Sequence, residues 1–366
     1  MDTEQILQGG EQVLSHLREL YQRHGYLPYK MSKFEEYDLY VRNKSFLVSE
    51  QVLTFTDLDG KLMALKPDVT LSILKNSSQE RGLQKVYYNE NVYRPASGAQ
   101  NFREIMQAGL ECIGQLDAFS VGEVVMLAAR SLELIRGDYL LDLSHLGIVS
   151  GLLSPMGLDR DGEQSLLRAM GEKNTPALQA LVQALHLPQP LTERLCRLAL
   201  LYGTPDQVLP ELEDVSAGEP NVRQALEELA DLCALLGQYG LGENLRLDFS
   251  IVNDMNYYSG IIFRGYLPGL ASGVLAGGRY DNLLKKMGRQ GGAIGFAVYL
   301  DQFQRLFAQE RGYDADVLLL YDGTCPPASV AAAANAALAS GKTVRVDREI
   351  PDHFRCRELR DLRKGV

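Results

Sequence analysis

Apolar side chains recur at helical spacing in two stretches of the first third of the chain. Over residues 4–23 they place Ile6, Leu17 and Tyr21 on one face, with polar residues on the other. A repeat near 3.6 residues is typical of an amphipathic helix. Residues 120–136 carry a similar pattern. We therefore expect one helix in each stretch.

Alternation of apolar and polar residues marks the strands. Residues 54–70 read TFTDLDGKLMALKPDVT, and the Asp59-Gly60 pair within them is a strong signal for a hairpin turn. Val86 to Tyr93 and Ile105 to Ile113 lie on either side of a loop with proline and glycine, which predicts an antiparallel pair. Further strand signals follow at Leu245 to Ile251, Tyr257 to Tyr266 and Ser272 to Ala276.

The middle and the end of the chain have different characters. Between about 160 and 240 the sequence is rich in leucine and alanine, with helical runs and scattered prolines. Strands before and after this region indicate an all-helical insertion in an α+β core, whose antiparallel sheet is flanked by helices. Strand signals near 317–321 and 343–346, around an alanine-rich helix, predict a short C-terminal βαβ unit. We expect a core at 1–155 and 241–312, the insertion at 156–240, and a truncated α/β segment at 313–366.

Composition narrows the function classes. The 366 residues are 46% hydrophobic and 23% charged, with a formal net charge of -10, which is ordinary for a globular protein. A surface of that sign repels phosphate backbones, so nucleic acid is not an expected partner. No apolar run approaches the roughly 18 residues of a membrane helix, and the first five residues lack a signal-peptide pattern. We expect a cytoplasmic protein that makes no membrane contact.

Cysteines and histidines give no metal or disulfide pattern. The five cysteines lie far apart without a CxxC pair, and the five histidines include no HExxH motif. We therefore predict no metal site and no cofactor, and we expect buried structural thiols. The cysteines are Cys112, Cys196, Cys233, Cys325 and Cys356.

Two pairs of polar residues suggest a common cleft. Asp68 and Thr70 lie two apart, so on a strand both side chains would point from one face. The alternative, a turn followed by a helix cap, is favoured by composition. Gln107 and Glu111 lie four apart on a predicted strand, hence on one face, where burial would require a polar ligand. Their alternative is a solvated sheet face.

Two further features could approach an anion. Arg94 and Arg103 flank the loop between the paired strands, and two guanidinium groups can hold an anion by forked hydrogen bonds. Gly277-Gly278, before a helix predicted from Tyr280 to Met287, could expose bare backbone, although a tight turn explains the pair as well. Residue chemistry therefore predicts a polar cleft on an antiparallel sheet.

Five sequence blocks, in this order, resemble the catalytic core of histidyl-tRNA synthetases over most of residues 1–310, the helical insertion excepted. The resemblance implies the class II aminoacyl-tRNA synthetase fold, in which an antiparallel sheet flanked by helices binds ATP and histidine. The blocks are TFTDLDGKLMALKPDVT, VYRPASGAQNFREIMQAGLECIG (motif 2), NYYSGIIF, AGGRYDNLL and AIGFAVYLDQF (motif 3).

Residues at the substrate positions of these blocks are kept. By resemblance they would line a pocket for histidine or a similar amino acid. They are Asp68, Thr70, Arg94, Gln107, Glu111, Tyr257 and Tyr258.

The departures from the synthetase pattern concern catalysis. Asn253 stands where the family has the arginine that stabilises the activated carboxylate, and Gln302 replaces the motif 3 arginine that contacts the ATP phosphates. Ala96 replaces an acidic residue of motif 2, and Ser32 stands for the motif 1 proline. Removing one such stabilising group costs roughly a hundredfold in rate or more. We therefore expect that aminoacylation is lost and that no catalytic residue remains.

This combination resembles the regulatory subunits of ATP phosphoribosyltransferase, which are paralogues of the synthetases. The resemblance implies a non-catalytic subunit in the first step of histidine biosynthesis. It would form a homodimer around residues 28–48, assemble with a short-form catalytic subunit into a hetero-octamer, enable that subunit and help mediate histidine feedback. Two alternatives stay open: a histidine-activating enzyme, and a free-standing histidine sensor.

Overall fold

A computed structural model describes residues 9–47, 51–77, 82–96, 101–216, 220–252, 257–303 and 312–364. Contacts between residues divide the chain into two compact units. The larger spans Val13–Gln302, and the smaller contains the residues from Phe303 on. Among the described helices none is long and apolar enough to cross a membrane.

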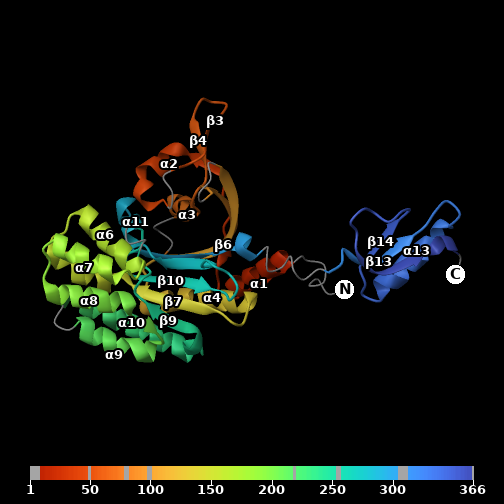
Figure 1. Cartoon of the computed structure of the whole chain (residues 1–366). Helices are drawn as coiled ribbons and strands as arrows, with labels where there is room; N and C mark the ends of the chain where they lie inside the picture. The colour runs from red at the N-terminus through yellow and green to blue at the C-terminus, as the bar shows by residue number, and fades with distance from the viewer. Residues whose placement is uncertain are drawn as a thin grey trace. The chain divides into compact units, whose positions relative to one another are not determined.

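The described part of the larger unit is built on a nine-stranded sheet (Figure 1). Its strand pairs are antiparallel except β1 with β5 and β7 with β9, which are parallel. This confirms the expected α+β class with a mainly antiparallel sheet. In spatial order the strands are β1 (Leu27–Pro28), β5 (Gln84–Pro95), β6 (Phe102–Gly114), β12 (Gly292–Tyr299), β11 (Leu275–Arg279), β10 (Ile261–Tyr266), β7 (Leu140–His145), β9 (Leu245–Asp248) and β8 (Tyr202–Gly203).

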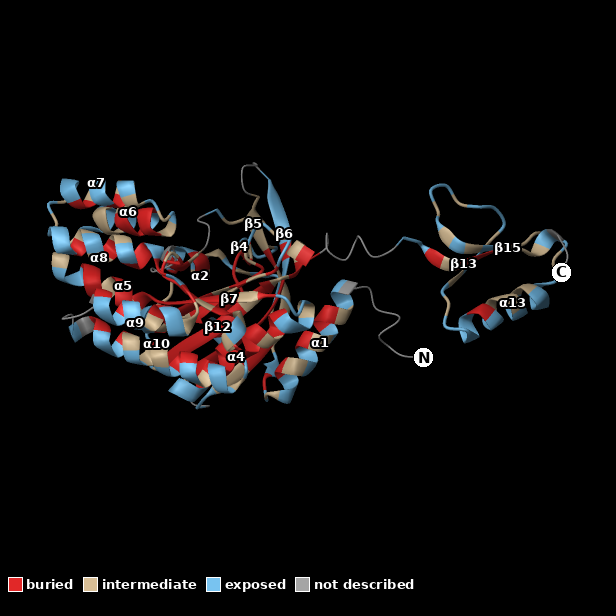
Figure 2. Cartoon of the chain, turned by 60° about the horizontal axis from the view of Figure 1, so that its bottom comes forward, coloured by how far each residue is buried: buried red, intermediate tan, exposed pale blue. Residues whose placement is uncertain are grey.

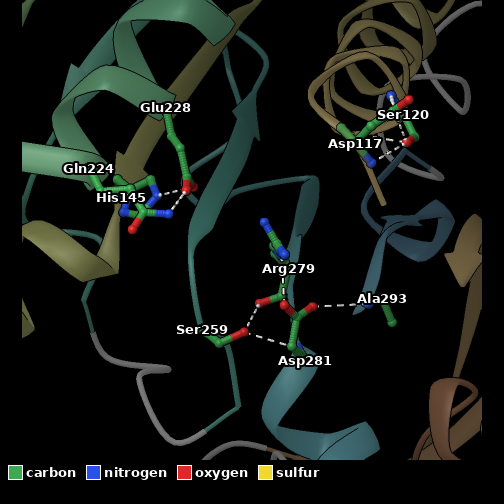
Figure 3. Close-up of polar contacts among 9 residues, drawn as sticks. All are labelled: Asp117, Ser120, His145, Gln224, Glu228, Ser259, Arg279, Asp281 and Ala293. Carbon is green, nitrogen blue, oxygen red and sulfur yellow. Dashed lines mark hydrogen bonds and ion pairs between the residues drawn. The ribbon is translucent and has the colours of Figure 1, made fainter. Parts of the chain in front are cut away.

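Helices α1 (Gly9–Arg23) and α4 (Ala118–Ile135) pack together against one face of this sheet. The Tyr21 hydroxyl and the Ser131 hydroxyl of the two helices lie 3.0 Å apart and are buried. Asp117 and Ser120 form a reciprocal capping box that begins α4 (Figure 3). Figure 2 shows buried residues concentrated in β7, β12 and the inner side of α4. Both helices were predicted; residues 4–8 of the first prediction lie outside the described residues.

A small sheet and short helices lie at the start of the chain. The sheet has the order β2-β4-β3, and β3 pairs antiparallel with β4 across Asp59-Gly60, which confirms the predicted hairpin. Gly60 has φ +79°, a left-handed conformation that glycine adopts without strain. The elements are β2 (Phe34–Glu36), α2 (Tyr37–Arg42), η2 (Lys44–Phe46), β3 (Thr54–Thr56), β4 (Leu62–Leu65) and α3 (Thr70–Asn76).

The middle of the chain is mostly helical, as predicted, but it is not all-helical: the two-residue strand β8 lies within it and pairs with β9 at the edge of the sheet. The helices also contact the sheet through polar pairs. The Nε2 of His145, at the end of β7, lies 3.2 Å from Glu228 Oε2 of α10 (Figure 3). Lys173 Nζ donates to Asp248 Oδ2 of β9 at 3.2 Å. The elements are α5 (Leu146–Leu153), η4 (Ser154–Met156), α6 (Arg160–Gly171), α7 (Thr175–Ala184), α8 (Gln189–Leu200), α9 (Pro205–Ser216), α10 (Pro220–Gln238) and η5 (Gly242–Asn244).

The C-terminal unit contains the predicted βαβ and one strand that was not predicted. β13 (Ala315–Leu320) pairs parallel with β14 (Val344–Asp347) across α13 (Pro327–Ala339). β15 (Cys356–Asp361) pairs parallel with the other edge of β13, and η7 (Leu362–Lys364) follows it. Because β15 is mostly charged, its sequence gives no strand alternation.

Two predictions around the glycine pair are wrong. Gly277 and Gly278 lie inside β11, opposite Phe296 and Gly295 of β12, and do not form a turn. A Cβ on Gly277 would lie 2.5 Å from the backbone oxygen of Gly295, so close strand packing explains the glycine. Strand β10 begins at Ile261, later than the predicted residue 257, and α11 (Asp281–Lys286) follows β11.

Candidate functional site

A cavity of about 500 Å³ opens on the sheet face opposite α4. Gly265 of β10 faces α4, because a Cβ there would meet Leu132, so its neighbour Arg264 faces the cavity side. The seven residues predicted to bind a histidine-like ligand all line this cavity: Asp68, Thr70, Arg94, Gln107, Glu111, Tyr257 and Tyr258. Sequence positions from 68 to 258 therefore meet in one cavity.

Glu111 lies at the base of the cavity, with 2% of its surface exposed. Its Oε1 accepts a hydrogen bond from the Thr70 hydroxyl at 2.7 Å, and its Oε2 accepts one from the Tyr280 hydroxyl. Across the strand pair lies Gly295, where a Cβ would come within 1.7 Å of Glu111 Oε2. The position of the Glu111 carboxyl group therefore depends on two hydrogen-bond donors and on the absence of a side chain at Gly295.

The same environment changes the acidity of Glu111. Burial raises its pKa from 4.5 to about 8, and the nearby Asp68 charge adds to the rise. Hydrogen bonds from Tyr280 and Thr70 act in the opposite direction. An uncharged Glu111 at neutral pH would ionise when a cation comes beside it, since an opposite charge favours the charged form.

Asp68 and Thr70 are not on a strand, so the strand-face interpretation is wrong; they lie at the start of a helix, as the alternative predicted, although the N-cap position itself is Val69. Thr70 begins α3, and Asp68 Oδ1 accepts a hydrogen bond from the Leu71 backbone N–H at 2.9 Å. Both side chains nevertheless line the cavity. Burial raises the pKa of Asp68, whereas that backbone bond and the Arg94 charge lower it.

Arg94 of β5 and Gln107 of β6 lie on neighbouring strands, and their side chains are on the same face of the sheet. Arg94 Nε donates to the Pro67 carbonyl at 2.8 Å, which ties β5 to the start of α3. Gln107 is 3% exposed, and its Nε2 has no hydrogen-bond partner among the described residues. A buried donor without a partner is costly and indicates an acceptor that comes from outside the chain. Arg103, paired opposite Arg94, is exposed and does not line the cavity.

Tyrosine rings form one wall. The Tyr257 ring centroid lies 4.7 Å from that of Tyr258 and 5.7 Å from that of Tyr280. Burial raises the pKa of both Tyr257 and Tyr280 well above 10, so both hydroxyls remain protonated donors. An apolar wall with polar tips suits a flat aromatic group.

Tyr280 and Arg264 line the cavity but were not predicted as site residues. Tyr280 lies in the AGGRYDNLL block, which could have pointed to it. Its position is set by Asp281, whose Oδ1 accepts from the Ala293 N–H at 3.0 Å and whose Oδ2 accepts from Arg279 Nε at 2.8 Å (Figure 3). Nothing in the sequence pattern distinguishes Arg264.

Of the two positions expected to have lost catalytic cations, the structure describes one, Gln302. Gln302 lies in η6 (Leu300–Phe303), where its Oε1 accepts from the Ser272 hydroxyl at 3.1 Å. Among the described residues it is not part of the cavity lining. Asn253 lies outside the described residues.

A mainly antiparallel sheet with helices on one face and a polar cavity on the other defines the class II aminoacyl-tRNA synthetase fold. A family model described as histidyl-tRNA synthetase matches residues 5–303. A structure titled ATP phosphoribosyltransferase regulatory subunit/histidyl-tRNA synthetase, from Bacillus halodurans C, superposes with a TM-score of 0.80 at 25% identity, covering 96% of this chain and 93% of that one.

Individual similar proteins indicate which group within this family the chain belongs to. The ATP phosphoribosyltransferase regulatory subunit of Symbiobacterium thermophilum is 31% identical over 339 residues, covering 87% of this chain and 83% of the relative. A chain in an ATP phosphoribosyl transferase (HisG:HisZ) complex from Thermotoga maritima shares the fold, with a TM-score of 0.61 at 18% identity, covering 78% of this chain and 96% of that one. This chain belongs to the histidyl-tRNA synthetase family and, within it, to the regulatory subunits of ATP phosphoribosyltransferase.

Proposed function

We propose that this chain is the non-catalytic regulatory subunit of an ATP phosphoribosyltransferase, which catalyses the first step of histidine biosynthesis. It binds a short-form catalytic subunit, makes that subunit active, and helps transmit feedback inhibition by histidine. Its own aminoacylation activity is lost.

One observation supports this function above the others: the amino-acid cavity is kept, while two of the cations that the resemblance assigns to synthetase chemistry are replaced, at positions 253 and 302. The seven residues expected to bind histidine line one cavity, with Glu111 buried and hydrogen-bonded at its base. Gln302 occupies the position of a phosphate-binding arginine. A protein that binds histidine without activating it suits regulation.

Histidine would bind with a cationic group beside Glu111 and Asp68 and its imidazole ring against Tyr257 and Tyr258. A cation relieves the cost of two buried carboxyl groups, and an acceptor on the ligand would satisfy Gln107 Nε2.

The proposal includes an assembly. The chain forms a homodimer through the region around residues 28–48, and dimers combine with catalytic subunits in a cytoplasmic hetero-octamer. Leu27, Phe34 and Val41, in or beside this region, are exposed apolar side chains. The three-part organisation into core (1–155, 241–312), helical insertion (156–240) and C-terminal segment (313–366) is part of the same proposal.

A mixing experiment tests the function. A short-form catalytic subunit is assayed for phosphoribosyl transfer with and without this chain, and the chain alone is assayed for histidine-dependent ATP–pyrophosphate exchange. We expect transferase activity to depend on the chain, histidine to inhibit the mixture, and exchange to be absent. Exchange by the chain alone would instead identify a histidine-activating enzyme. Histidine binding without any effect on the catalytic subunit would identify a free-standing sensor.

A pair of variants tests whether histidine inhibits the complex by binding in this cavity. Histidine inhibition of the complex should be lost in Glu111→Ala and kept in Glu104→Ala, whose carboxylate is exposed on the same strand. Inhibition that survives Glu111→Ala would place the regulatory site elsewhere.

A further inference from the structure

The cavity contains a cation that the function above does not use. Arg264, in the middle of β10, lines the cavity together with Arg94. The described lining contains two carboxyl groups and two guanidinium groups, which belong to Asp68, Glu111, Arg94 and Arg264. A balanced set of this kind favours a ligand with both charges over a polyanion such as ATP, which would meet the two carboxyl groups.

Small residues open a path from Arg264 toward β6, the strand that carries Gln107 and Glu111. Strand pairing puts Gly109 beside Ala297, Ala297 beside Ala276, and Ala276 beside Arg264. Paired residues share a sheet face at about 4.8 Å per strand, so this row spans roughly 14 Å. The Tyr88 ring covers Gly109, since a Cβ there would lie 2.7 Å from its Cζ, but Ala297 and Ala276 carry only methyl groups. A long arginine side chain therefore has room to lie over these two alanines, as far as the Tyr88 ring.

Gln107 marks the other end of that path. It is paired with Tyr299 of β12, in the row next to Gly109 and Ala297. Its buried Nε2 has no partner among the described residues. An anionic acceptor between Gln107 and the arginine would satisfy the amide and pair with the guanidinium group, which binds carboxylates in a forked geometry.

We propose that Arg264 binds the carboxylate of the amino-acid ligand and so determines that the cavity selects a free amino acid over the corresponding amine. The cationic end of the ligand lies beside Glu111 and Asp68, and its carboxylate lies between Gln107 and Arg264. This inference rests on the proposed histidine cavity and adds a specificity-determining residue to it. Arg264 would supply this positive charge from β10, whereas position 253, where the resemblance expects an arginine, is an asparagine.

Calorimetry on the full chain tests this with two ligands, L-histidine and histamine, which lacks the carboxylate. We expect the unchanged chain to bind histidine at least about tenfold more tightly than histamine. Only histidine has a carboxylate for Arg264, and one charge-assisted hydrogen bond contributes about this factor to affinity. Arg264→Ala should weaken histidine binding by about tenfold or more and change histamine binding by less than about twofold. Arg264→Gln, which keeps most of the side-chain length, should behave similarly and covers the case in which the alanine variant does not fold.

Arg103→Ala is the matched control, because this exposed arginine lies on the adjacent hairpin outside the cavity; it should change neither affinity. Equal losses for histidine and histamine in the Arg264 variants would overturn the inference while leaving the histidine cavity intact. ATP binding that depends on Arg264, with histidine binding unchanged, would also overturn it. Absence of histidine binding in the unchanged chain would refute the histidine cavity, and this inference with it.

Discussion

Glu111 is the residue on which the cavity depends most. Its carboxyl group is buried, both its oxygens accept hydrogen bonds, and its pKa is raised to about 8. The protonated form is stable in the folded chain at a pH where an unfolded glutamate is charged. A cationic ligand favours the charged form of Glu111. Ligand binding near neutral pH should therefore release a proton from Glu111 to the solvent.

The stability of the chain should consequently decrease with pH through this group. A pKa raised from 4.5 to about 8 means that the folded state binds a proton that the unfolded state has lost between these values. The Glu111 contribution is complete below about 4.5 and is lost as pH rises toward 8. Urea unfolding at pH 5, 6.5 and 8 should show up to roughly 1 kcal/mol more loss per pH unit in the unchanged chain than in Glu111→Gln. Equal slopes in the two proteins would contradict the raised pKa.

Gly295 provides a second test at this scale. In Gly295→Ala the new Cβ would lie 1.7 Å from Glu111 Oε2, so the carboxyl group must move. We expect a loss of about 1–3 kcal/mol in the free energy of unfolding and loss of histidine binding in calorimetry. Gly237→Ala, in α10 with nothing within 4 Å of the new Cβ, is the control and should be neutral or stabilising. Normal histidine binding by Gly295→Ala would show that the position of Glu111 is not critical.

Restoring the two missing arginines should not restore synthesis. The double variant Asn253→Arg with Gln302→Arg returns both cations but leaves Ala96 at an acidic position of motif 2, and Gln302 lies outside the described cavity lining. Catalytic groups must be held close to productive geometry to act. ATP–pyrophosphate exchange should remain at background. Exchange near that of a working histidyl-tRNA synthetase would show that the two arginines were the decisive losses.

At the scale of elements, the cavity depends on where α11 begins. Asp281 ties the first turn of α11 to β12 through Ala293 and to β11 through Arg279, while its backbone N–H donates to the Ser259 hydroxyl at 2.9 Å (Figure 3). These bonds fix the preceding residue, Tyr280, whose hydroxyl reaches Glu111. A helix of six residues gains its position from such tertiary bonds.

Asp281→Ala should therefore affect both stability and binding. We expect a loss of about 1–3 kcal/mol in the free energy of unfolding, because buried donors lose their acceptor, and weaker histidine binding through Tyr280. Asp138→Ala is the matched control: Asp138 also pairs with an arginine two residues earlier, but its side chain is 56% exposed against 17% for Asp281. An exposed pair contributes about 1 kcal/mol or less. Similar losses in the two variants would contradict the anchoring role of Asp281.

At the scale of the whole molecule, the region around residues 28–48 carries exposed apolar side chains that a partner could cover. Leu27 is 68% exposed and Phe34 is 45% exposed, in or beside the region around 28–48. Apolar side chains gathered on a surface are typical of sites where proteins associate. The proposed homodimer would cover them.

Light scattering on the purified chain tests whether it forms the proposed homodimer. The mass should be about twice 40.6 kDa at micromolar concentration and should not depend strongly on salt, since an apolar interface is not screened. A mass of one chain at that concentration would contradict the dimer.

Local sequence patterns were sufficient to predict many of the helices and strands. The hairpin at 54–70, the β5–β6 pair and α4 follow from alternation, helical periodicity and turn residues, which act over a few neighbouring positions. The ordered sequence blocks also indicated the class II fold and the seven cavity residues. These features are encoded in short stretches, so the sequence by itself determined them.

Other features depended on contacts between distant parts of the chain. Gly277 and Gly278 lie within a strand that has no room for side chains there, because β12 crowds Gly277 and the Tyr258 ring crowds Gly278. β15 is a strand because β13 has an open edge. The raised pKa of Glu111 and its bond with Tyr280, 169 positions away, result from burial against other strands and helices. The same holds for Gln107 Nε2, which has no partner among the described residues. Burial and pairing are set by what the fold brings together, and for that reason only the tertiary structure decided them.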